Sequence, residues 1–193
     1  SVIQKKAMLL LVLVTAMRSM GQSAIMAFLP LYLLTDLGYS HFEVGIFMPM
    51  AQFVGIGSQP LMGWVSDRWG RKIVLVPGTA FLGLLCLALS QADPGIQLVL
   101  TILAMGAFLY SLHAIFIAAA MDVSGGGVQS TAVSVIYGAG FLGTLSPFLA
   151  GIIVDASEIT NAFIYGGCII LLSSVILFFT RLPRVSVQDS PGP

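Results

Sequence analysis

Long apolar segments alternate with short polar breaks along the whole chain. A helix needs about 20 apolar residues to cross the hydrocarbon core of a membrane, and the chain contains six segments of about that length. We predict membrane-spanning helices near residues 7–34, 42–65, 73–90, 96–121, 128–154 and 160–180. Residues 181–193 are polar and rich in proline, and we expect them to form a tail outside this helical domain.

The composition supports a protein whose main solvent is lipid. Of its 193 residues, 58% are hydrophobic and 8% are charged, whereas soluble domains carry about 25% charged residues. So few charged side chains cannot cover the surface of a protein dissolved in water. We therefore predict an all-α integral membrane bundle of six helices with membrane lipid around it. The net charge of zero favours no nucleic acid partner. The two cysteines, Cys86 and Cys168, lie apart in apolar segments and indicate packing rather than a disulfide, metal or cofactor site.

The basic residues predict the orientation of the bundle. In a six-helix arrangement, seven of them fall on one side of the membrane, namely Lys5, Lys6, Arg68, Arg71, Lys72, Arg181 and Arg184. The breaks on the other side contain acidic residues but no Lys or Arg. Because loops rich in Lys and Arg stay in the cytoplasm, we expect both termini there, in a multi-pass protein of the plasma (inner) membrane.

One polar break carries an ordered pattern of glycine, acidic and basic residues. It reads Gly63-Trp-Val-Ser-Asp67-Arg68-Trp-Gly70-Arg71-Lys72. Asp67 and Arg71 are spaced to form an ion pair. Gly63 allows a helix to approach a neighbour closely, and Gly70 permits a tight reversal of the chain. This pattern, between the second and third helices, resembles the signature of the major facilitator superfamily.

The resemblance implies a transporter fold of twelve helices, of which this chain supplies six. It implies that the motif residues bias the protein toward one facing state. Residues 143–151 also look like a degenerate glycine–proline motif of the drug antiporters in that superfamily. The fourth helix lacks the arginine motif of proton-coupled drug antiporters, and the chain begins without Met. We therefore expect this chain to be the carboxy-terminal half of such a transporter. The amino-terminal half would then be missing, or a second copy of this chain would take its place. The expected function is secondary active transport of a small molecule by alternating access, with efflux favoured.

Prolines and glycines interrupt several of the predicted helices. Two segments share one pattern, in which a proline precedes a glycine and an aspartate follows that glycine by four residues. The first contains Pro60, Gly63 and Asp67, and the second contains Pro147, Gly151 and Asp155. They lie in helices of opposite direction, which indicates two inverted three-helix repeats, an arrangement found in transporters. The alternative is that these small residues serve helix packing alone.

Polar residues inside the predicted spans mark a candidate substrate cavity. Arg18 lies near the membrane midplane, where a charge costs at least about 2.5–3.5 kcal/mol and usually marks a site. Helical spacing adds polar stripes on the first, second, fourth and fifth helices. The candidate cavity residues are Arg18, Gln22, Gln52, Gln59, Tyr110, His113 and Tyr137. The fifth-helix stripe, which includes Tyr137, consists of Ser130, Ser134, Tyr137, Phe141 and Thr144.

Other interpretations of these polar residues stay open. Arg18 could form a structural ion pair or extend toward the interface. His113 could titrate near neutral pH and couple transport to protons, or simply form an interhelical hydrogen bond. Two further functions remain as alternatives: a scaffold or receptor that does not transport, and an intramembrane hydrolase that uses Ser23 with His113. A nucleophile and its base must lie within hydrogen-bond reach, and the local motif around Ser23 is weak, so we predict no enzymatic activity.

Overall fold

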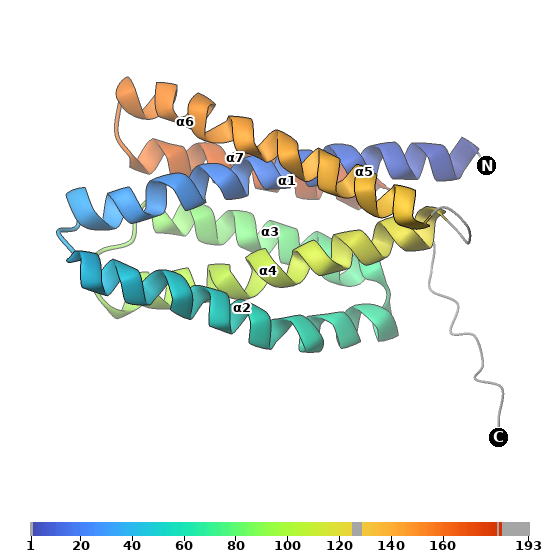
Figure 1. Cartoon of the computed structure of the whole chain (residues 1–193), viewed down its shortest axis with the longest axis horizontal. Coiled ribbons are helices and arrows are strands. Elements are labelled where there is room, and N and C mark those ends of the chain that lie inside the picture. Colours follow the sequence, from blue (N-terminus) through green and yellow to red (C-terminus); the bar gives the residue numbers. More distant parts are fainter. Residues whose placement is uncertain (1, 125–128, 181, 183–193) are drawn as a thin grey trace.

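The chain folds into a bundle of long helices that run back and forth along one axis (Figure 1). The computed structural model describes residues 2–124, 129–180 and 182. Within these ranges the elements are α1 (Val2–Thr35), α2 (His41–Trp69), α3 (Arg71–Leu89), α4 (Ile96–Ser124), α5 (Gln129–Phe141), the short 3₁₀ helix η1 (Leu142–Leu145), α6 (Ser146–Asp155) and α7 (Thr160–Phe179). Most of the predicted tail, residues 181 and 183–193, lies outside the described residues.

The prediction of an all-α membrane bundle is confirmed. Among the described residues, five stretches are long and apolar enough to cross a membrane: Gln4–Thr35, Arg71–Leu89, Ile96–Ser124, Gln129–Asp155 and Thr160–Phe179. The chain is therefore an integral, multi-pass membrane protein. α2 has 29 residues but is not among the five, because its glutamines, prolines and glycines lower its mean hydropathy. A sixth crossing through α2 stays a prediction.

Proline interrupts the helices at fewer places than the sequence predicted. α1 continues through Pro30, and α2 continues through Pro49 and Pro60, because one proline removes only one backbone donor from a long helix. The predicted span over residues 128–154 does change its winding. It is divided into α5, η1 and α6, with Pro147 in the first turn of α6 and the amide of Ser146 bonded to the carbonyl of Gly143. This i to i−3 bond is the tighter 3₁₀ pattern.

The helix contacts follow the expected inverted repeat. α2 packs along α4, and the α5–η1–α6 element packs along α1. In the same way, α3 packs against α4 while α7 packs against α1, and α3 and α7 pack against each other. Exchanging the first three helices with the last three therefore reproduces the same set of neighbours. The aspartates of the shared pattern also correspond, since Asp67 lies in the last turn of α2 and Asp155 ends α6.

Glycines bring the helix backbones together, although not at the predicted glycine. A Cβ atom added to Gly55 would lie 2.7 Å from the carbonyl oxygen of Gly106, and one added to Gly143 would lie 2.7 Å from that of Ser19. The predicted close approach at Gly63 is wrong within the described residues, because a Cβ there meets nothing within 4 Å. At about 100° per residue, Gly63 is rotated about 80° from Gly55, which faces α4.

Candidate functional site

The motif forms a sharp turn between two helices rather than a loop. The sequence predicted helix ends near residues 65 and 73, but α2 continues to Trp69 and α3 begins at Arg71, so only Gly70 lies between them. Gly70 has φ 104° and ψ 144°, in the region that favours glycine, and its amide donates to the carbonyl of Ser66 at 3.0 Å. The predicted reversal at Gly70 is confirmed, and its tightness places the motif charges on helix ends.

Arg71 ties this turn to two helices. Its guanidinium pairs with Asp67, four residues earlier at the end of α2, as the spacing predicted, and it donates to Ser66 Oγ at 3.3 Å. Its Nε also donates to Asp122 Oδ2 at 2.9 Å, and Asp122 lies in the last turns of α4. The sequence analysis missed Asp122. The position of Asp122 along the chain could have indicated this contact. Because α4 ends on the same side of the membrane as α2, an acidic residue near the end of α4 lies level with the motif.

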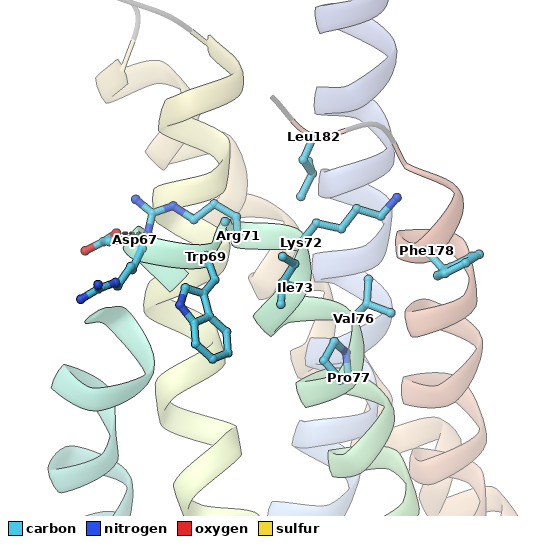
Figure 2. Close-up of a pocket in the computed structure, with 11 residues that line it drawn as sticks. Asp67, Trp69, Arg71, Lys72, Ile73, Val76, Pro77, Phe178 and Leu182 are labelled. Atoms are coloured by element: carbon cyan, nitrogen blue, oxygen red, sulfur yellow. Dashed lines mark hydrogen bonds and ion pairs between the residues drawn. The ribbon is translucent and has the colours of Figure 1, made fainter. Parts of the chain in front are cut away.

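The two other motif cations have aromatic rather than acidic neighbours. The guanidinium of Arg68 lies 5.4 Å from the ring centre of Trp64, and Lys72 Nζ lies 5.5 Å from that of Phe178 on α7. Neither forms an ion pair with another described residue. Figure 2 shows Lys72 pointing toward the α7 side, away from the Asp67–Arg71 pair. The three cations therefore have separate surroundings.

Arg18 is buried inside the bundle without a carboxylate partner among the described residues. Its side chain is 1% exposed. It donates to Gln22 Oε1 at 2.8 Å and contacts His113 Nδ1 at 3.4 Å, and its guanidinium lies 5.5 Å from the ring centre of Phe116. Its Nε has no hydrogen-bond partner in the described part of the chain. Because a guanidinium only donates, Nδ1 of His113 must be the acceptor in this contact.

His113 connects Arg18 to the surface of the bundle. It is half-buried on α4, and its ring meets the ring of Tyr137 on α5 edge to face at 5.6 Å between centres. Tyr137 is 56% exposed, so Arg18, His113 and Tyr137 form a path from the interior to the outside. No hydrogen bond in the described ranges joins His113 to Ser23, the contact that the hydrolase alternative requires.

The remaining cavity candidates lie along the contact between α2 and α4. Gln59 donates through Nε2 to the backbone carbonyl of Tyr110 at 3.3 Å, and the Tyr110 side chain packs on Gly55. Gln52 is exposed and borders a small cleft of about 30 Å³ together with Tyr110 and Met26. The structure therefore joins Arg18, Gln22, His113 and Tyr137 in one contact chain and places Gln52, Gln59 and Tyr110 in a second group.

The predicted polar stripe on the fifth span faces outward. All of its members are exposed: Ser130, Ser134, Tyr137, Phe141 and Thr144. Within the stripe, Ser134 Oγ donates to the carbonyl of Ser130 at 3.0 Å and Thr144 Oγ1 donates to that of Phe141 at 2.7 Å, whereas the hydroxyls of Ser130 and Tyr137 have no hydrogen-bond partner among the described residues. An unpartnered polar group in hydrocarbon costs several kcal/mol. The stripe favours contact with water or with another protein surface.

Comparison with known proteins agrees with the motif and the helices. No curated protein matches the chain. The family model described as Major Facilitator Superfamily matches residues 11–193, which include the motif turn and most of the described helices. Proteins of this family are membrane transporters for small molecules. By this match over nearly the whole length, the chain belongs to the Major Facilitator Superfamily.

Proposed function

We propose that this chain is one six-helix half of a secondary transporter that moves a small molecule by alternating access. The observation that carries the proposal is the exposed polar face on one side of an otherwise apolar bundle, with Tyr137 at its centre and Arg18 behind it. A second half facing this side would enclose a polar pathway. α2 would be the sixth crossing, since it packs along the full-length span α4 and exposes Phe53 and Leu61.

The substrate would meet the outer members of the contact chain. Tyr137, His113 and Gln22 are the accessible groups, and Gln52 and Tyr110 add a second polar patch on the α2 side. Arg18 would act from behind them, because its 1% exposure leaves little direct access. Its positive charge, which no described carboxylate neutralises, would favour a substrate with an anionic or electron-rich group.

The motif turn would bias the facing state. Arg71 links the α2–α3 turn to α4 through Asp122, so movement of α4 would be transmitted to the turn. The Asp67 side chain keeps 64% of its surface exposed, and Gly63 has open space around it. Both would be available to the second half of the transporter.

The proposal also covers the orientation of the bundle in the membrane, the direction of transport and its coupling to protons. The start of α1, which carries Lys5 and Lys6, and the turn between α2 and α3 lie at the same end of the bundle (Figure 1), so the positive-inside rule would place that end on the cytoplasmic side of a plasma (inner) membrane. Efflux is supported by the similarity of residues 143–151 to the drug antiporter motif. His113 is the candidate proton carrier, because it is the histidine inside a span.

Alkylation of single cysteines tests the polar pathway without knowledge of the substrate. In the whole protein with Cys86 and Cys168 replaced by Ala, Tyr137→Cys is compared with Leu172→Cys in native membranes. The two native side chains are similarly exposed, at 56% and 53%, but Leu172 lies on the apolar α7. The cysteine thiolate, which forms only in contact with water, attacks the double bond of N-ethylmaleimide, so we expect labelling at position 137 to be faster by on the order of tenfold. Equally slow labelling at both positions would mean that lipid covers the polar face.

A further inference from the structure

A groove opens at the motif end of the bundle, away from the polar face. It has a volume of about 680 Å³. Residues 67–73 of the motif turn form one wall, Val76 and Pro77 lie on α3, and Phe178 and Leu182 complete the other side (Figure 2). The groove therefore combines cationic and apolar lining at the depth where a membrane helix meets the headgroups.

The charge of the groove is positive. Its lining contains three cations, Arg68, Arg71 and Lys72, against one carboxylate, Asp67. Arg71 is already engaged by Asp67 and Asp122. Lys72 has only an aromatic neighbour, Phe178, among the described residues, so its three donors are directed at no acceptor. An anion entering the groove would meet Lys72 without having to displace a carboxylate.

The groove continues into an apolar stripe on α3. Ile73, Phe81 and Leu84 are 58%, 46% and 54% exposed, and Pro77 lies between them on the same face. These positions are spaced three or four residues apart, so they form one line down the helix. Phe178 and Phe179 extend the apolar surface on α7. A ligand that fits both parts has an anionic head beside Lys72 and a hydrocarbon chain along α3.

We propose that this groove binds an anionic phospholipid. Lys72 contacts the phosphodiester, Trp69 lies at the headgroup level as aromatic residues do at membrane interfaces, and an acyl chain follows Ile73 and Pro77. Inorganic phosphate or a soluble phosphate ester would use the cation but leave the apolar stripe unused. The site lies on a different surface from the polar face, so it does not depend on the transport function proposed above.

The two tryptophans of the chain provide a local assay, because Trp69 lines the groove and Trp64 does not. The whole protein carrying Trp64→Phe is reconstituted in phosphatidylcholine bilayers that contain brominated phosphatidylglycerol or brominated phosphatidylcholine. Bromine quenches only nearby indoles, so quenching of Trp69 reports lipid in the groove. One lysine near a membrane surface contributes about 1 kcal/mol toward an anionic lipid, so we expect about fivefold preferential binding of the brominated phosphatidylglycerol.

Matched variants separate a site from general attraction. Lys72→Gln should remove the preference while leaving quenching by brominated phosphatidylcholine unchanged, which also shows that the fold is intact. Lys72→Arg should retain the preference. Lys5→Gln removes an exposed cation at the same end of the bundle but outside the groove, and it should have no effect.

Three outcomes would overturn the proposal. Equal quenching of Trp69 by the two brominated lipids would show that the groove does not select an anionic headgroup. An equal loss of preference in Lys5→Gln and Lys72→Gln would show attraction to the surface as a whole. Recovery of Trp69 fluorescence on adding excess inorganic phosphate would show a site for a free anion instead of a lipid.

Discussion

The contact between Gly106 of α4 and Ala51 of α2 allows a quantitative test of how the bundle is packed. A Cβ atom added to Gly106 would overlap the carbonyl oxygen of Ala51 and would lie 2.7 Å from its carbonyl carbon and 2.8 Å from its Cα. Carbon atoms in contact prefer about 3.5–4.0 Å, so Gly106→Ala requires the helices to separate by roughly 1 Å. No rotamer change relieves this overlap, because the obstacle is backbone.

We expect Gly106→Ala to destabilise the protein by about 1–3 kcal/mol, the usual effect of overpacking a core. For a chain of this size, that lowers the melting temperature by about 2–12 °C. The measurement is thermal unfolding of the whole detergent-solubilised protein, followed by far-UV circular dichroism. The matched control is Gly57→Ala in α2, where an added Cβ meets nothing within 4 Å, and we expect that variant to be unchanged or up to about 1 kcal/mol more stable.

The reasoning would be refuted if Gly106→Ala and Gly57→Ala melted at the same temperature. That result would mean that α2 and α4 do not contact each other at their glycines. The two helices would then have to pack in a different register.

Three further predictions concern buried polar groups and the motif turn. Asp122→Asn should lower stability by about 1–2 kcal/mol, because it weakens a charge-assisted bond to the largely buried Arg71; a double-mutant cycle with Arg71→Gln should show coupling, and additive effects would contradict the pair. Arg18→Met should raise stability by about 1–3 kcal/mol, because an unpaired buried charge is replaced by an apolar side chain, yet abolish transport by the whole protein; lower stability, or unchanged transport, would count against this interpretation. Thr79→Val should be neutral or stabilising by up to about 1 kcal/mol in the same melting assay, because Thr79 Oγ1 is buried without a hydrogen-bond partner among the described residues, and a clear loss would show that the hydroxyl is bonded.

Patterns within short stretches of the sequence were sufficient to predict the helices of this protein. Runs of apolar residues predicted the spans, because the thickness of a membrane sets their length. The spacing of Asp67 and Arg71 in the motif predicted their pairing, which the structure forms across the Gly70 turn between α2 and α3. Helical periodicity predicted that the polar residues around Tyr137 share one helix face, and the structure added that this face is exposed. In each case the relevant residues lie close together in the sequence.

Only the tertiary structure decided which residues from different helices meet. The partnership of Arg71 with Asp122 spans 51 positions, and the contact of Arg18 with His113 spans 95. The sequence also could not show that Gly106, rather than Gly63, allows close helix approach. These outcomes depend on which helices are neighbours and on how each is rotated about its own axis. Both are fixed by the packing of the whole bundle, since an apolar helix in lipid carries only a weak local signal of which side faces a partner.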